Sequence, residues 1–182
     1  MEPGSYFPDI MTDEAVRFIA TERANPFFLY LPFNLPHYPM QPTTEAFDLY
    51  AHVADVRRRF YAACVTTMDR CIGRVLNAVH SNGLTQDTIV IFLSDHGHSE
   101  EDHAMGGKGR TDQLRGAKGN MWEGGIRVPC IVSWPASLPS GQRRSQPVTS
   151  LDWLPTIAEW CEVDVSDLDL DGHSLRSVID SP

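Results

Sequence analysis

The hydrophobic positions of this chain of 182 residues follow helical repeats in three places. Apolar residues recur every three or four positions from Val53 to Val79, which predicts an amphipathic helix of about eight turns that ends at Asn82-Gly83. An earlier helix is expected to begin at Thr12, whose hydroxyl would cap it, with two acidic residues in its first turn. Leu151 to Trp160 is the third expected helix, and Pro155 falls in its first turn, where proline is tolerated.

Three short runs of apolar residues predict strands. Phe27 to Phe33 is almost continuously apolar, which is typical of a strand buried on both faces in a parallel sheet. Thr88 to Leu93 is the second such run, and Ile126 to Trp134 the third, with Pro129 suggesting an edge or a bulge. Strand, long helix and strand in this order predict an α/β fold with a mostly parallel sheet flanked by helices.

A long polar loop separates the second and third predicted strands. It begins with Ser94-Asp95-His96-Gly97, directly after the strand, and carries Arg115 and Lys118 further along. In α/β sheets, ligands bind just beyond the carboxyl ends of strands, so Asp95 and His96 are candidate metal ligands and Lys118 is a candidate anion contact. The carboxylate suits Ca²⁺ or Mg²⁺ and the imidazole a transition metal. The alternative is a turn in which Asp95 only caps the following segment.

Several other polar groups fit structural roles better than chemical ones. The acidic stretch after Gly97 is expected to be a solvated loop, because its histidine spacing does not match a compact zinc motif. Arg57-Arg58-Arg59 is expected to be a solvated helix face, and Cys64 and Cys71 lie on a helical period and are expected in the core. The acidic stretch contains His98, Glu100, Glu101, Asp102 and His103.

Composition excludes two classes of partner. The net charge is −9 and there is no basic stripe, which argues against nucleic acid. No run approaches the roughly 18 consecutive apolar residues of a membrane-spanning helix, so no membrane partner is expected. A hydrophobic content of 42% and a charged fraction of 21% are ordinary for a globular protein. Oligomeric state and localisation are not indicated.

The order of several motifs carries a family resemblance. The chain resembles the second half of the catalytic domain of sulfatases, members of the alkaline-phosphatase superfamily. The resemblance covers nearly the whole chain. Its motifs are Pro26–His37, the helix Phe60–Gly83, Ser94-Asp95-His96-Gly97, Arg115-Gly116-Ala117-Lys118, Glu123-Gly124-Gly125-Ile126-Arg127-Val128-Pro129, Leu151–Ile157 and Asp171-Gly172.

The resemblance implies roles for individual residues. His37 would contact and protonate the leaving oxygen, and Lys118 would bind the substrate. Arg115 would either bind substrate or brace its loop. Asp95 and His96 would hold a divalent metal. Many sulfatases have Asp-Asn at this motif and bind Ca²⁺, and a sizeable group has Asp-His, as this chain does. Glu123 and Arg127 are expected to form a structural pair around a glycine turn.

The family nucleophile has no counterpart in this chain. Sulfatases use a formylglycine made from the Cys or Ser of a Cys/Ser-x-Pro-x-Arg motif, and no Cys or Ser here has that context. The chain is therefore interpreted as residues 1–182 of a partial sulfatase catalytic domain, with the formylglycine expected in a missing N-terminal half. The intact parent would hydrolyse a small-molecule or glycan sulfate monoester. The alternatives are a phosphonate monoester or phosphodiester hydrolase of the same superfamily, or a non-catalytic metal-binding remnant.

Overall fold

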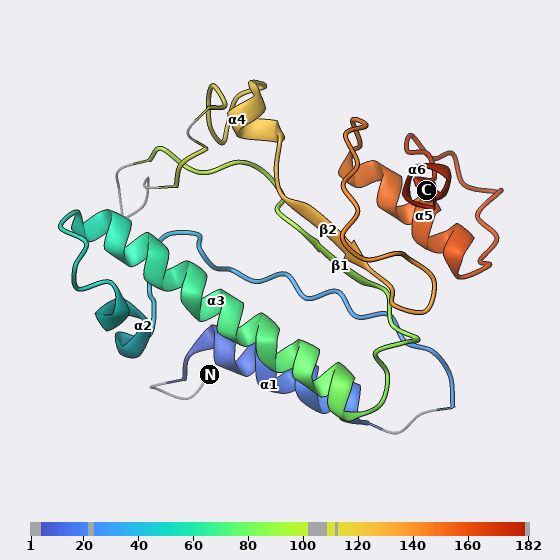
Figure 1. Ribbon diagram of the computed structural model, residues 1–182, viewed down its shortest axis with the longest axis horizontal. Coiled ribbons are helices and arrows are strands. Elements are labelled where there is room, and N and C mark those ends of the chain that lie inside the picture. Colours follow the sequence, from blue (N-terminus) through green and yellow to red (C-terminus); the bar gives the residue numbers. More distant parts are fainter. Residues whose placement is uncertain (1–4, 22–23, 102–108, 112, 181–182) are drawn as a thin grey trace.

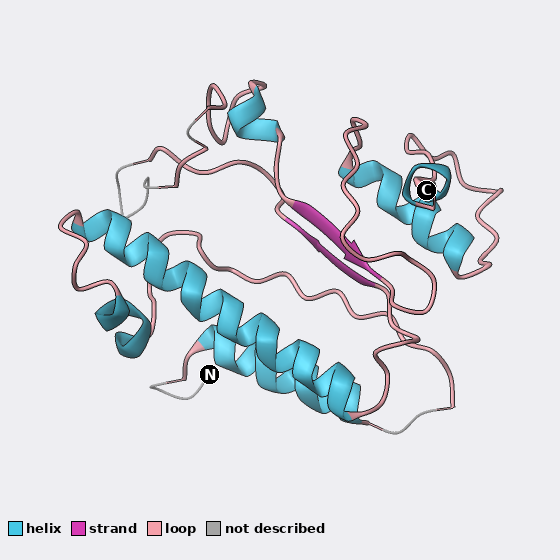
Figure 2. Cartoon of the chain, in the orientation of Figure 1, coloured by secondary structure: helices cyan, strands magenta, loops and turns pink. Residues whose placement is uncertain are grey.

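The computed structural model describes residues 5–21, 24–101, 109–111 and 113–180. Figure 1 shows a long helix lying beside a second helix, a small sheet, and a separate group of short helices near the C-terminus, and Figure 2 shows how much of the chain between them is loop. The elements in chain order are α1 (Phe7–Ala20), α2 (Thr44–Leu49), α3 (Val56–Ser81), β1 (Val90–Leu93), α4 (Glu123–Ile126), β2 (Cys130–Ser133), the 3-10 turn η2 (Ser150–Asp152), α5 (Trp153–Trp160) and α6 (Arg176–Ile179).

Helix α3 confirms the long amphipathic helix that the sequence predicts. Its N-cap is Asp55, whose carboxylate accepts hydrogen bonds from the backbone N–H groups of Arg57 and Arg58 at 3.0 and 3.3 Å. The helix ends at Asn82, and Gly83 follows with a φ of 70°, a left-handed conformation that glycine adopts without a steric penalty. Both ends are therefore set by residues next to the apolar repeat.

Helix α1 begins earlier than the sequence indicates. It starts at Phe7, so the expected N-cap, Thr12, lies inside the helix. Thr12 is fully buried, and its hydroxyl donates to the carbonyl of Pro8, 2.7 Å away and one turn earlier. The prediction of a helix start at Thr12 is wrong because a threonine hydroxyl can bond to the preceding turn as well as cap a new helix.

The expectation of a solvated face for the three arginines at the start of α3 is also wrong for Arg59. Its side chain is mostly buried, with its guanidinium 3.7 Å from the centre of the Phe47 ring. Its Nε donates to the carbonyl of Phe47 at 2.9 Å, which ties α2 to α3. The long aliphatic stem and flat head of arginine allow it to cover an aromatic ring in this way.

The apolar run Phe27–Phe33 is extended but is not buried on both faces, contrary to the sequence prediction. Phe27 and Leu29 pack on the cluster formed by α1 and α3, which contains Ile19, Ala78 and Val79. Phe28 and Tyr30, which point the other way, are 73% and 77% exposed. Among the described residues, positions 28–33 make no backbone hydrogen bond, so this run is not a sheet strand here.

The sheet of the described residues consists of β1 and β2. They pair antiparallel, with Val90 opposite Ser133 and Leu93 opposite Cys130. The third predicted strand, from Ile126, begins too early because Ile126 closes the short helix α4. The parallel neighbours expected for Thr88–Leu93 are not seen within residues 5–180 where these are described.

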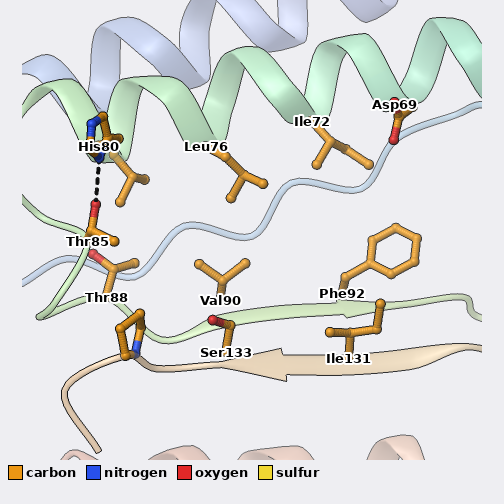
Figure 3. Close-up of a pocket in the computed structure, with 12 residues that line it drawn as sticks. Asp69, Ile72, Leu76, His80, Thr85, Thr88, Val90, Phe92, Ile131 and Ser133 are labelled. Atoms are coloured by element: carbon orange, nitrogen blue, oxygen red, sulfur yellow. Dashed lines mark hydrogen bonds between the residues drawn. The ribbon is translucent and has the colours of Figure 1, made fainter. Parts of the chain in front are cut away.

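An apolar groove of about 440 Å³ runs between α3 and the strands. Figure 3 shows Ile72 and Leu76 of α3 pointing toward Phe92 of β1 and Ile131 of β2 across this space. The sheet therefore does not pack tightly against α3. Its β1 edge away from β2 has no strand partner in the described part of the chain.

The predicted helix from Leu151 to Trp160 is confirmed as η2 followed by α5. Asp152 organises its start, because its carboxylate accepts from the backbone N–H of Thr149 at 2.7 Å and of His173 at 2.9 Å. The bond from His173, followed by that from Thr149, lowers the pKa of Asp152 below its ordinary value. The turn at Asp171-Gly172 is thereby fixed to the helix. No helix in the described ranges is long and apolar enough to span a bilayer.

Candidate active site

The loop that follows the extended segment presents His37. The backbone N–H of His37 donates to the carbonyl of Asn34 at 3.0 Å, and Leu35 is buried in the cluster with Met40 and Cys64. The ring Nδ1 lies 2.6 Å from the carbonyl oxygen of Tyr38. A carbonyl can only accept, so Nδ1 carries the proton of this bond and Nε2 is turned outward to other partners.

Lys118 is the partner that Nε2 meets. Its Nζ lies 3.3 Å from His37 Nε2, a contact between residues 81 positions apart. The backbone N–H of Lys118 donates to the carbonyl of His98 at 2.8 Å, which fixes the lysine loop to the segment after β1. The two residues for which the sequence predicts leaving-group roles are therefore in direct contact.

Asp95 and His96 stand at the end of β1. His96 Nδ1 lies 2.9 Å from the carbonyl oxygen of Gly97, which places its proton there by the same reasoning. Its Nε2 then faces Asp95, with Oδ2 3.2 Å away. The side chain of Asp95 is 81% exposed and that of His96 is 39% exposed, so the pair is open to solvent.

The donor atoms of this pair fit a divalent cation. Two ligands at right angles on a cation with bonds of about 2.3 Å stand about 3.2 Å apart, and Asp95 Oδ2 and His96 Nε2 have that separation. In the described ranges, no group of three or more His, Cys, Asp or Glu side chains could hold a metal. The pair is thus at most part of a coordination shell.

Glycine backbones hold the three loop motifs together. The N–H of Gly97 donates to the carbonyl of Gly125 at 2.8 Å, and a Cβ on Gly97 would meet the carbonyl oxygen of Gly124 at 1.8 Å. A Cβ on Gly124 would in turn meet the carbonyl oxygen of Gly116 at 1.9 Å. Only glycine, which has no Cβ, allows these loop segments to approach each other so closely.

Arg115 and the Glu123–Arg127 pair are part of this frame. The guanidinium of Arg115 lies 3.8 Å from the centre of the Trp122 ring, and its carbonyl accepts from the N–H of Gly124 at 2.7 Å. Arg127 donates to Glu123 at 3.0 Å, as the sequence predicts for a structural pair. These contacts fit a bracing role for Arg115, and substrate binding by its guanidinium stays a prediction.

Two residues near His37 escape the sequence analysis. Tyr38 stacks on His37, with ring centres 4.3 Å apart, and its hydroxyl donates to Glu101. Glu101 also accepts from the hydroxyl of Ser99 at 3.0 Å, so this side chain, which is exposed as expected for the acidic stretch, is also held by hydrogen bonds. The position of Tyr38 directly after the histidine was the available signal. Asp102 and His103 of the same stretch lie outside the described residues.

The apolar groove is not the candidate site. None of His37, Lys118, Asp95 or His96 lines it, and its walls offer few polar groups. Chemistry that handles a charged ester needs the fixed polar groups at the loop ends instead.

Comparison with known proteins defines the class to which this fold and site belong. The family model described as Sulfatase matches residues 1–163, and the chain belongs to the sulfatase family. This confirms the resemblance drawn from the motifs. The sulfatase family in general acts on sulfate esters and uses a divalent metal and a formylglycine.

Individual relatives place the chain within that family. It is 37% identical to the steryl-sulfatase of Mus musculus over 179 residues and 38% identical to arylsulfatase D of Homo sapiens over 171 residues. These matches cover 93% and 91% of this chain but 27% and 28% of the relatives. The crystal structure of Ps i-CgsB in complex with k-i-k-neocarrahexaose has a TM-score of 0.90 at 32% identity, covering 100% of this chain and 40% of that one. The α/β fold of the sulfatases, as part of a domain, is thereby confirmed.

Proposed function

We propose that this chain supplies the leaving-group side and part of the metal site of a sulfatase, and that the whole protein hydrolyses aryl or carbohydrate sulfate monoesters. The observation that carries the proposal is the 3.3 Å contact between Lys118 Nζ and His37 Nε2. It joins two groups from distant loops, and the backbone N–H of Lys118 donates to the carbonyl of His98, two residues after His96. The domain boundaries proposed are residues 1–182 of a longer catalytic domain, in line with the fraction of each relative that the chain matches.

The chemistry of the leaving oxygen explains why these two groups belong together. When the S–O bond of a sulfate ester breaks, negative charge builds on the oxygen that departs. The ammonium of Lys118 stabilises that charge without having to move, and the imidazole of His37, when protonated at Nε2, gives this oxygen its proton. The backbone carbonyl of Tyr38 accepts from Nδ1, so Nε2 is the ring nitrogen that is left to face the substrate.

Asp95 and His96 are the residues proposed to hold the divalent cation, with Ca²⁺ as the first choice and another divalent metal as the alternative. The cation would neutralise charge on the sulfate oxygens and orient the ester. Ca²⁺ takes about six to eight oxygen ligands, and this pair supplies one oxygen-bearing and one nitrogen-bearing side chain. The remaining ligands and the formylglycine are proposed to come from sequence outside these 182 residues.

The first test measures cation binding by the 182-residue chain. Calorimetry with Ca²⁺ is expected to give binding weaker than micromolar, because the coordination shell is incomplete, and Asp95→Asn is expected to remove it. Sub-micromolar affinity of the isolated chain would contradict the assignment of a partial site. His80→Ala is a matched control, because His80 lies at the far end of α3 and lines the groove instead of the site.

The second test measures turnover in a completed domain. This chain is fused behind the N-terminal portion of the Formosa agariphila sulfatase, a 31% identical relative of which it matches 34%. Hydrolysis of an aryl sulfate is expected, and His37→Ala or Lys118→Ala should lower it by roughly a hundredfold or more, the loss typical of one transition-state contact. Again His80→Ala is the control. A folded fusion that prefers a phosphodiester, or one that binds Ca²⁺ without turnover, would support the two alternative functions instead.

A further inference from the structure

Tyr38 connects the core to the candidate site. Its ring is partly buried against the cluster of Leu35, Met40 and Cys64, which α3 shares with the loop. The same ring also contacts His37 and Lys118 of the candidate site. It stacks on His37 at 4.3 Å between ring centres with a tilt of 31°, and Lys118 Nζ lies 5.4 Å from its centre. A cation at this distance from an aromatic face is attracted to it.

Glu101 holds the far end of the same side chain. The Tyr38 hydroxyl donates to the Glu101 carboxylate, which also accepts from Ser99 at 3.0 Å. The backbone N–H of Glu101 returns a bond to Ser99 Oγ at 3.1 Å, so the carboxylate is fixed by its own turn. Ser99 follows His98, whose carbonyl accepts the N–H of Lys118. The histidine loop, the segment after β1 and the lysine loop therefore meet around one tyrosine.

We infer that Tyr38, anchored by Glu101, is a positioning residue that keeps His37 and Lys118 in register with each other. The inference rests on the proposed function for its purpose, since the two groups it aligns are those that would serve the leaving oxygen. It does not require Tyr38 to touch the substrate. Its physical content is that an aromatic ring held between a packed cluster and a hydrogen-bonded carboxylate has one orientation. His37 stacks on this ring and the Lys118 ammonium is attracted to it, so the ring sets the positions of both side chains.

The hydrogen bond has its own signature in the tyrosine. Donation to Glu101 raises the pKa of Tyr38 above its ordinary value, because loss of the proton would place two negative oxygens in contact. Replacing Glu101 with Gln removes that repulsion, so the pKa of Tyr38 should fall back toward its ordinary value. Tyr50 is the C-cap of α2, with its hydroxyl 2.8 Å from Thr66 Oγ1, and among the described residues it contacts none of the site, so it offers a control position in the same chain.

Nuclear magnetic resonance on the 182-residue chain tests the positioning directly. With ¹⁵N-labelled histidine, the wild type should show His37 with its proton on Nδ1 and a cross-peak between its ring and the Lys118 side chain. The signals are assigned by their disappearance in His37→Gln. Tyr38→Leu is expected to abolish the cross-peak and to weaken the tautomer preference, which then depends on the backbone carbonyl of residue 38 alone. Tyr38→Phe and Glu101→Gln, which retain the packed ring, are expected to weaken both, while Tyr50→Phe leaves them unchanged.

The outcome is separable from that of the proposed function. If Tyr38→Phe and Glu101→Gln both keep the wild-type tautomer and cross-peak, Tyr38 is only a packing residue and the inference is overturned. This holds even if Tyr38→Leu fails to fold, because the two milder variants keep the ring in the cluster. An inactive completed domain would count against the proposed function, yet it would leave the resonance result as it stands.

Discussion

Single side chains in the candidate site take their direction from the backbone immediately beside them. His37 donates Nδ1–H to the carbonyl of Tyr38, and His96 donates Nδ1–H to the carbonyl of Gly97. In each case the acceptor belongs to the next residue, and Nε2 is turned to a charged partner, Lys118 or Asp95. The same local hydrogen bond therefore leaves Nε2 of both rings free to face a charged group. The proposed function gives His37 Nε2 a role at the leaving oxygen and His96 Nε2 a role in metal ligation.

Gly124 offers a sharp test at the residue scale. A Cβ there would stand 1.9 Å from the carbonyl oxygen of Gly116, a backbone atom that cannot move aside cheaply. Gly124→Ala is expected to lower the free energy of unfolding by about 1–3 kcal/mol or more through this clash. Gly73→Ala is the matched control, since Gly73 lies inside α3 with no atom within 4 Å of its added Cβ, and it should gain about 1 kcal/mol. Urea unfolding measures both, and equal stability of Gly124→Ala and wild type would contradict the close approach.

At the scale of elements, the helices with long apolar repeats were predictable and the extended segments were not. In helix α3 and helix α5 apolar residues recur every three or four positions, a spacing that is typical of amphipathic helices and not of strands. The run Phe27–Phe33 has no such distinction, because a continuous apolar stretch indicates burial without saying what covers it. In this chain its second face is exposed, so the parallel strand expected from sequence is not formed.

The candidate site shows the same division. Asp95 and His96 are predicted because they follow an apolar run directly, and His37 and Lys118 because their motifs resemble those of the family. The contact between His37 and Lys118 is what the structure adds. The contact of Tyr38 with Glu101 spans 63 positions, and no local pattern encodes it. The N-cap at Thr12 failed for a related reason: a threonine side chain has two competing local partners, and tertiary packing decides between them.

The alternating burial of Phe27–Phe33 leads to a prediction at this scale. Leu29 packs on the α1–α3 cluster, so Leu29→Ala should lower the free energy of unfolding by about 1–2 kcal/mol, less than for a fully buried leucine. Tyr30→Ala removes a side chain that is 77% exposed and should change it by no more than about 0.5 kcal/mol. Chemical denaturation of the two variants distinguishes them. Equal losses would mean that the segment is covered on both faces in solution.

At the scale of the whole molecule, the proposed function assigns to this chain the groups that serve the leaving oxygen and part of the metal site, but not the group that attacks sulfur. Among the described residues, the His37 imidazole lies 3.3 Å from the Lys118 ammonium, and Asp95 lies 3.2 Å from His96 just after β1. The described residues also leave one edge of β1 unpaired and an apolar groove beside it. Both features belong to a domain of which the relatives contain considerably more, since the chain matches 27% and 28% of the first two.

The last prediction concerns the activity of the purified 182-residue chain. Hydrolysis by the sulfatase route needs a formylglycine, and no Cys or Ser of this sequence lies in a Cys/Ser-x-Pro-x-Arg context. His37 and Lys118 can assist a leaving oxygen only after something has attacked sulfur, so they give no turnover by themselves. An aryl sulfate assay should therefore show no hydrolysis above background, with or without Ca²⁺. Turnover that His37→Ala abolished would prove that this chain contains its own nucleophile.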